Sequence, residues 1–205
     1  MKREEFFATW SKLHLDAEIK GIVKGWLNIS YFMARGLSAL RITPNILTLL
    51  GVLTAMAALF YSNSVIALIF LVLSLICDGV DGSVAIVSGK VSQFGATLDA
   101  IADRITEGLW FFALYQWGIP PEICLALFAL ALTQEYARAR MASLGFHEIG
   151  VVTIAERPVR ASAIAIFMVL ELLDFSFAPY AIYVFTAMAT FSVYQVMRAA
   201  HRYLA

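Results

Sequence analysis

Residues 42–77 read ITPNILTLLGVLTAMAALFYSNSVIALIFLVLSLIC and contain no charged side chain. This run of 36 residues is too long for one membrane-spanning helix, which needs ~20 apolar residues. The tripeptide Ser-Asn-Ser at 62–64 interrupts the run and is typical of a short polar turn. The stretch therefore predicts two spanning helices joined by a tight turn, at about 45–61 and 65–87.

The composition of the whole chain agrees with a membrane protein. Of the 205 residues, 61% are apolar and 15% are charged, and the mean hydropathy is +0.79. Soluble domains carry about 45–50% apolar and about 25% charged residues. The formal net charge is +0, whereas a nucleic-acid-binding protein has a strong basic excess. We therefore expect an integral membrane protein whose partner is the lipid bilayer, with no nucleic-acid partner.

The remaining sequence predicts four more spanning helices and a separate N-terminal segment. The further spans are expected at about 93–117, 122–142, 158–173 and 178–199. In residues 1–40, apolar side chains recur at helical spacing with lysines on the other face. Such a pattern is typical of a helix that lies in the membrane interface or packs on the cytoplasmic face of the protein. We expect an all-α protein with N-terminal amphipathic and juxtamembrane helices at 1–40 and a six-span domain at 41–205.

The basic residues predict the orientation of these spans. The connections after the first, third and fifth spans contain no Lys or Arg. Loops rich in Lys and Arg stay on the cytoplasmic side of a membrane. We therefore expect a multi-pass protein of the cell (plasma) membrane with both termini in the cytoplasm.

Four aspartates stand inside the second and third predicted spans, where a charge is costly unless it is paired or hydrated. Asp78 and Asp81 are three residues apart and Asp99 and Asp103 are four apart, so each pair shares one helix face. The two spans are antiparallel neighbours, so the two faces can meet. Clustered carboxylates need counter-charge, and oxygen ligands select Mg²⁺, Mn²⁺ or Ca²⁺. A metal site, a buried charge network and an ion pathway in a transporter all fit these residues.

The two acidic stretches carry a family resemblance. They read Asp78-Gly-Val-Asp81-Gly82-Ser-Val-Ala85-Ile86 and Gly95-Ala-Thr-Leu-Asp99-Ala-Ile-Ala-Asp103. They resemble the signature D-x2-D-G-x2-A-R-x8-G-x3-D-x3-D of the CDP-alcohol phosphotransferases. Every spacing matches, and the one departure is Ile86, where the family has arginine. The six-span layout, the amphipathic lead-in helix and the tripeptide Thr43-Pro44-Asn45 resemble the family as well.

The resemblance implies an enzyme that moves a phosphatidyl group from CDP-diacylglycerol to an alcohol and releases CMP. It implies two divalent metals per active site, Mg²⁺ or Mn²⁺, and family members are commonly homodimers. The implied metal ligands are Asp78, Asp81, Asp99 and Asp103, and Asp103 is also the implied general base. The implied donor-binding residues are Asn45, Asp78, Asp81, Gly82, Ala85 and Gly95. Lys90, one helical turn after Ile86, is a candidate replacement for the missing arginine.

A second group of basic residues bears on the acceptor. It consists of Arg138, Arg140, Arg157, Arg160 and Arg198. Arginine suits bidentate phosphate binding, so the group predicts a phosphorylated acceptor, although basic residues gather at cytoplasmic helix ends in any case. The stretches Arg138-Ala-Arg140 and Glu156-Arg157-Pro158-Val-Arg160 resemble actinobacterial phosphatidylinositol phosphate synthases, which implies inositol phosphate. The same arginines would serve glycerol 3-phosphate, the acceptor of phosphatidylglycerophosphate synthases.

Two other functional classes stay open at this point. A cation- or proton-coupled membrane transporter would use the aspartates as a relay, and an inactive family member would only bind its ligands. Two smaller expectations concern single residues. Glu107 is expected to bond Arg104 or a neighbouring helix rather than take part in catalysis. Trp110, Tyr115 and Trp117 are expected in the outer aromatic belt of the membrane.

Overall fold

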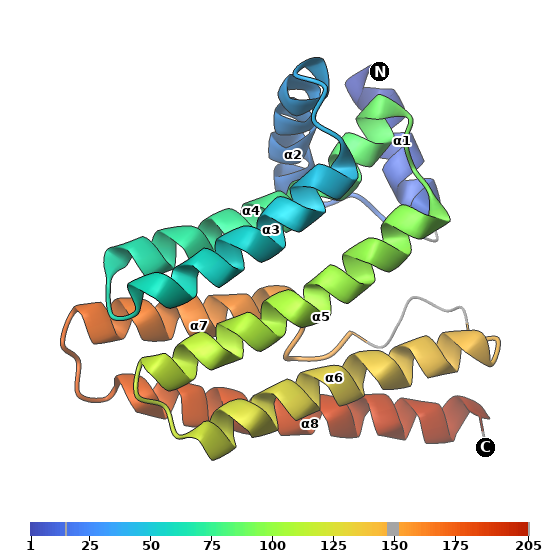
Figure 1. Ribbon diagram of the computed structural model, residues 1–205. Coiled ribbons are helices and arrows are strands. Elements are labelled where there is room, and N and C mark those ends of the chain that lie inside the picture. Colours follow the sequence, from blue (N-terminus) through green and yellow to red (C-terminus); the bar gives the residue numbers. More distant parts are fainter. Residues whose placement is uncertain (15, 147–151, 205) are drawn as a thin grey trace. The chain divides into compact units, whose positions relative to one another are not determined.

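The computed structural model describes residues 1–14, 16–146 and 152–204, and every regular element in these residues is a helix. The all-α class is therefore confirmed (Figure 1). The elements are α1 (Arg3–Leu13), α2 (Gly21–Ala39), α3 (Pro44–Ala58), the 3₁₀ turn η1 (Leu59–Tyr61), α4 (Val65–Ser88), α5 (Gln93–Gln116), α6 (Pro121–Ser143), α7 (Arg157–Leu172) and α8 (Ala178–Leu204). Each predicted span corresponds to one helix, with α3 and η1 together forming the first.

Three of the described helical segments are long and apolar enough to cross a membrane by length and composition alone. They are Pro44–Tyr61, Val65–Ser88 and Ala178–Leu204. The other three predicted spans, α5, α6 and α7, are either less apolar or shorter than these three segments. Ionisable side chains interrupt α5 and α6, and α7 has 16 residues, or roughly 24 Å at 1.5 Å per residue. The bilayer core is ~30 Å thick. The helices thus indicate a membrane protein, while the count of six spans stays a prediction.

The chain forms two compact units. One consists of Met1–Ala55 and Val72–Thr106, and the other of Met56–Leu71 and Glu107–Ala205.

In the first unit, the N-terminal helices pack on α4. Phe6 of α1, Leu27 and Tyr31 of α2 and Ile86 of α4 form one buried apolar cluster. The Ser83 hydroxyl of α4 also donates to the Ser30 hydroxyl of α2 at 3.1 Å. α1 and α2 therefore pack on α4, while the prediction that this is the cytoplasmic face stays a prediction.

The same N-terminal segment also leaves apolar side chains uncovered. Ile22 is 92% exposed, and Ile29 and Phe32 of α2 are exposed as well. Exposed apolar side chains beside Lys20 and Lys24 are typical of a helix at the membrane interface. The interfacial placement of α2 remains a prediction that this exposure supports.

Two residues with left-handed backbone conformation mark the start and the end of α4. Asn63 joins α3 to α4 in a left-handed conformation with φ 56°, which asparagine tolerates better than most residues. Gly89 ends α4 with φ 67°, and the Lys90 amide donates to the Ala85 carbonyl at 2.8 Å. This is a Schellman cap, which needs a residue without a Cβ penalty at its left-handed position. The chain then returns as α5, antiparallel to α4.

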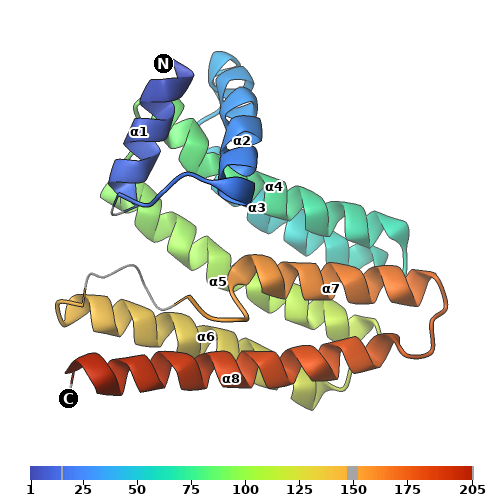
Figure 2. The same cartoon turned by 180° about the vertical axis from the view of Figure 1, so that it is seen from behind.

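In the second unit, α6 and α7 both pack along α8 (Figure 2). Trp110 is only 1% exposed and Trp117 is also buried, while Tyr115 is exposed. The Trp117 ring meets the Phe167 ring of α7 edge-on, with centroids 6.4 Å apart. The expectation of a membrane belt is therefore wrong for Trp110 and Trp117, because this face of α5 turns toward its neighbouring helices.

Candidate functional site

Three of the four predicted metal ligands meet in the first unit. Asp78 of α4 and Asp99 and Asp103 of α5 each offer one carboxylate oxygen, and these oxygens all lie within 4.8 Å of one another. The three side chains are half-buried. The helical spacing places Asp99 and Asp103 on one face of α5, and the antiparallel return of the chain sets that face against Asp78. The predicted meeting of the acidic faces is confirmed for these three residues, which we call the acidic cluster.

The fourth aspartate is held differently. Asp81 is 5% exposed, its Oδ2 accepts a hydrogen bond from the Thr48 hydroxyl at 2.5 Å, and its Oδ1 accepts from the Gly82 amide at 2.6 Å. Asp81 is therefore tied to α3 and to its own helix. Thr48 was missed by the sequence prediction, and its signal was a hydroxyl in an otherwise apolar run, one turn after Pro44.

The donor set of the acidic cluster fits a hard divalent cation. Carboxylate oxygens are the preferred ligands of Mg²⁺ and Mn²⁺, and three like charges this close need positive charge beside them. The Arg104 guanidinium lies 3.4 Å from the Asp103 Oδ2, so one basic side chain already borders the cluster. The arrangement can hold a metal and can accept a proton at a carboxylate oxygen.

The two predicted donor-binding glycines have different surroundings, with open space beside Gly82 and close neighbours beside Gly95. A methyl group added at Gly82 would have no described atom within 4 Å. One added at Gly95 would lie 3.0 Å from the Ser92 Oγ and 3.6 Å from the Asn45 Oδ1. The structure therefore brings the predicted donor-binding residues Asn45 and Gly95 together and leaves room beside Gly82.

Ile86, the departure from the family motif, is explained by packing. It is 4% exposed and lies in the cluster with Phe6, Leu27 and Tyr31, so the N-terminal helices require an apolar side chain there. Lys90 is exposed just beyond the end of α4. Its role as a substitute for the missing arginine stays a prediction.

Arg160 is used inside the second unit instead of being presented to a ligand. It is 1% exposed, and its Nε donates to the Glu107 Oε1. Its Nη1 donates to the Ala155 carbonyl at 2.9 Å and its Nη2 to the Glu135 Oε1 at 3.0 Å. This geometry does not favour the predicted contact with an acceptor phosphate, because protein acceptors engage all three nitrogens. It confirms the structural role expected for Glu107.

Arg138 makes a two-pronged ion pair at the start of α7. Its Nη1 donates to the Glu156 Oε2 at 2.9 Å and its Nη2 to the Glu156 Oε1. The Thr153 amide and hydroxyl also donate to Glu156. Burial acts to raise the pKa of Glu156, but the hydrogen bonds from Arg138 and Thr153 outweigh it, so this pKa lies below its usual value. The carboxylate stays ionised and keeps Arg138 in a fixed orientation.

The other three arginines have different surroundings. The Arg157 guanidinium lies over the Trp110 ring, 5.3 Å from its centroid, in a cation–π contact. Arg140 is exposed and donates to the Ser143 hydroxyl at 3.3 Å. Arg198 is exposed on α8. Arg138 and Arg157 are thus the half-buried members of the group.

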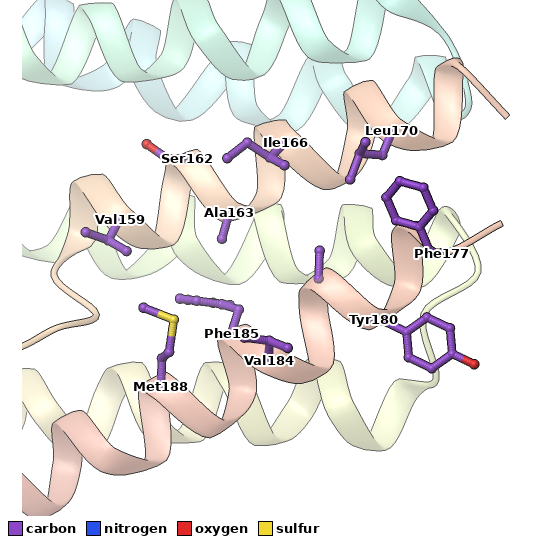
Figure 3. A pocket seen from close by; sticks show the side chains of 11 residues that line it. Val159, Ser162, Ala163, Ile166, Leu170, Phe177, Tyr180, Val184, Phe185 and Met188 are labelled. Carbon is purple, nitrogen blue, oxygen red and sulfur yellow. The ribbon is translucent and has the colours of Figure 1, made fainter. Parts of the chain in front are cut away.

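A groove of about 460 Å³ lies between α7 and α8, and Arg160 is not among the residues that line it (Figure 3). Its walls are almost wholly apolar and include Val159, Ile166, Phe177, Val184 and Met188. Such a surface offers a phosphate no basic side chain and suits contact with lipid chains. No arginine of the basic group lines this groove.

Several known proteins resemble this chain in sequence. An archaetidylinositol phosphate synthase of Aeropyrum pernix is 39% identical over 135 residues, which covers 64% of this chain and 69% of the relative. A phosphatidylinositol phosphate synthase of Mycobacterium tuberculosis is 31% identical over 159 residues, which covers 72% of this chain and 71% of the relative.

Solved structures of the M. tuberculosis phosphatidylinositol phosphate synthase share the fold. One, in complex with manganese and citrate, matches with a TM-score of 0.71 at 22% identity and covers 82% of this chain and 87% of that chain. Another, with CDP-DAG bound, matches with a TM-score of 0.69 at 23% identity and covers 83% and 92%. The sequence pattern of one family also matches residues 41–196, which include the whole acidic motif. The chain belongs to the CDP-alcohol phosphatidyltransferase family.

Proposed function

We propose that this protein is a membrane enzyme of phospholipid biosynthesis that transfers a phosphatidyl group from CDP-diacylglycerol to a phosphorylated polyol and releases CMP. The observation that carries the proposal is the meeting of Asp78, Asp99 and Asp103 within 4.8 Å in the spacing of the family motif. The names of the two relatives differ in the lipid part but agree on inositol phosphate. Inositol phosphate is therefore our first choice of acceptor.

Divalent metal is the cofactor we propose for the acidic cluster, with two ions of Mg²⁺ or Mn²⁺ per site. Asp78, Asp99 and Asp103 would hold it together with Asp81, whose carboxylate accepts hydrogen bonds from the Thr48 hydroxyl and the Gly82 amide. Bound metal supplies charge neutralisation for the pyrophosphate and for the departing CMP. A likeness to a manganese-bound structure supports the proposal.

Residues of the first unit would carry the transfer itself. The acceptor hydroxyl oxygen forms a bond to the phosphatidyl phosphorus, the bond from that phosphorus to the CMP oxygen breaks, and Asp103 takes the hydroxyl proton. The open space beside Gly82 would admit the cytidine nucleotide, with Ala85, Gly95 and Asn45 around it. We keep Lys90 as a proposed contact to the donor.

Residues of the second unit would bind the acceptor phosphate. Arg138 and Arg157 are half-buried and held in place, and Arg140 and Arg198 are exposed. Arginine binds phosphate bidentately, so this set suits a phosphorylated acceptor better than free inositol. Arg160 is buried and pairs with Glu107 and Glu135, so we do not assign it a contact with the acceptor.

The membrane arrangement that we propose has six spans, formed by α3 with η1 and by α4 to α8. Within the second unit α6 and α7 pack along α8, which is apolar enough to cross the bilayer, so all three would cross side by side. The uneven distribution of Lys and Arg predicts that both termini lie in the cytoplasm, and α1 and α2 would then lie at the inner surface of the plasma membrane. We also propose a homodimer, because members of the family commonly form homodimers.

The test is release of CMP by the purified protein with CDP-diacylglycerol and Mg²⁺. Inositol 1-phosphate, glycerol 3-phosphate and free inositol are compared as acceptors. Turnover with inositol 1-phosphate alone is the expected result, and turnover with glycerol 3-phosphate alone would overturn the acceptor but keep the chemistry. If no acceptor yields CMP with Mg²⁺ or Mn²⁺, the transferase proposal fails, and a transporter or an inactive binding protein takes its place.

The variant Asp103→Asn separates catalysis from binding. It should lower turnover by roughly 100-fold or more, the usual contribution of a general base. Binding of CDP-diacylglycerol, measured by calorimetry in detergent, should persist because the other aspartates remain. Undiminished CMP release by this variant would exclude Asp103 as the base.

A further inference from the structure

Five charged side chains of the second unit form a continuous chain of alternating sign. In order they are Glu107, Arg160, Glu135, Arg138 and Glu156, and we call them the ion chain. Glu107 lies in α5, and Glu135 and Arg138 lie in α6. Arg160 lies in α7, and Glu156 directly precedes α7. Sequence separation conceals this order, because its links join residues up to 53 positions apart.

One end of the ion chain is buried and rigid. Glu107 and Arg160 are both enclosed by the protein, and the Arg160 guanidinium has protein acceptors at all three nitrogens. A fully buried pair of this kind moves little, because any displaced group would remain as an unpaired charge. This end is an anchor that joins α5 to α7.

The other end is half-buried. Arg138 and Glu156 keep about a quarter of their side-chain surface exposed, with 22% and 27% respectively. Glu135 connects the two ends, because its Oε1 lies 3.0 Å from the Arg160 Nη2 and 3.6 Å from the Arg138 Nη1. A single carboxylate oxygen thus faces a buried and a half-buried arginine.

We propose that Glu135 is a positioning residue for the acceptor site, which transmits the fixed position of Arg160 to Arg138. The inference rests on the proposed function, in which Arg138 binds the acceptor phosphate. Arginine has many rotamers, and holding its planar guanidinium in one orientation before binding lowers the entropy lost when the phosphate arrives. Glu135 would therefore affect acceptor affinity without touching the acceptor, the donor or the metal.

The first experiment replaces Glu135 by Gln, which keeps the shape and removes the charge. The expected result is a rise of roughly tenfold in KM for inositol 1-phosphate, with the KM for CDP-diacylglycerol unchanged. The control is Glu122→Gln, an exposed glutamate in the first turn of the same helix. A purely structural role for Glu135 would instead lower the amount of active protein and affect both substrates alike, which would overturn the inference.

The second experiment repeats the change in an Arg138→Met background. If Glu135 acts through Arg138, Glu135→Gln should cause no further rise in acceptor KM once Arg138 is gone. An additive rise would overturn the inference. If Glu135→Gln does not accumulate as folded protein, Glu135→Asp is measured in the same way, because its shorter side chain cannot bridge both arginines and should raise the acceptor KM.

A binding measurement keeps this inference separate from the proposed function. Calorimetric titration of each variant with inositol 1-phosphate needs no turnover. Without CMP release from the parent protein, the transferase proposal fails, but a weaker titration for Glu135→Gln than for Glu122→Gln still supports the positioning role. Equal binding by these two variants would refute it.

Discussion

The acidic cluster and the ion chain are both groups of charged side chains in largely apolar helices, but they balance charge in opposite ways. In the acidic cluster three carboxylates approach within 4.8 Å of one another. In the ion chain three glutamates alternate with two arginines, and each neighbouring pair is of opposite sign. Like charges at short range call for an added cation, whereas alternating charges hold one another.

This difference suggests that the protein would bind its two proposed substrates, the CDP-diacylglycerol donor and the phosphorylated acceptor, in different ways. The acidic cluster is arranged to take up metal and, with it, an anionic pyrophosphate. The ion chain is already near balance, so we propose that it fixes the positions of arginines instead of attracting a counter-ion. Variants of the ion chain should therefore leave Mn²⁺ binding unchanged, and variants of the acidic cluster should leave the melting temperature unchanged.

The largest expected effect comes from removing a carboxylate of the acidic cluster. Asp99→Asn should weaken Mn²⁺ binding and lower CMP release by on the order of 100-fold, because one of the proposed oxygen ligands of the metal is lost. Electron paramagnetic resonance of added Mn²⁺ measures the binding directly. Asp174→Asn, at an exposed aspartate in the turn after α7, is the control. Normal Mn²⁺ affinity in Asp99→Asn would show that the metal binds elsewhere.

Breaking the buried end of the ion chain should act on stability. Arg160→Met leaves Glu107 and Glu135 facing each other without their shared cation, which costs about 3–5 kcal/mol. The melting temperature in detergent should fall by on the order of 10 °C. The exposed Arg140→Met should melt like the parent protein. If Arg160→Met were equally stable, the ion chain would not be a structural anchor.

Two glycines of α4 sharpen the description of the first unit. A methyl group at Gly79 would come within 2.6 Å of the Trp26 Cζ2, so Gly79→Ala should destabilise the packing of α2 by about 1–3 kcal/mol. Gly82→Ala has no described atom in its way and should fold normally. It should instead raise the KM for CDP-diacylglycerol, since we propose that the donor occupies the space beside Gly82. Equal melting temperatures for the two variants would contradict the close contact of Trp26 with α4.

The smallest expected effect concerns the half-buried end of the ion chain and depends on pH. The folded pKa of Glu156 is lowered, so its contribution to stability is present above the unfolded value of about 4.3 and is lost as pH falls through the folded pKa. The melting temperature of Glu156→Gln should lie a few degrees below that of the parent at pH 7. The two should converge as the pH falls below about 4. A constant difference across this range would exclude the titration of Glu156 as its cause.

Most of the helices could be predicted from the sequence because apolar runs and polar turns alternate plainly. The Ser-Asn-Ser turn at 62–64 is such a local signal, and it lies between two helices as expected. The spacing of Asp99 and Asp103 also predicted that they share a face. The meeting of these residues with Asp78 followed from the short loop between two antiparallel helices.

The rest depends on contacts between distant segments, which spacing does not record. Arg160 looked like a ligand because an arginine at a helix start suits phosphate, and only the fold shows Glu107 beside it. Thr48 carried no motif that linked it to Asp81. Trp110 was expected at the membrane surface because an aromatic ring near a helix end is common there, but Arg157 covers it instead.

The buried Ile86 has a practical consequence for anyone who tries to restore the family motif. An arginine at this position would have to place a guanidinium among Phe6, Leu27 and Tyr31, where burial of an unpaired charge costs several kcal/mol. Ile86→Arg would thus separate α1 and α2 from α4 before the new arginine could bind a phosphate. An engineer would have to redesign α1 and α2 first, because in this chain the side chain at position 86 packs against these two helices.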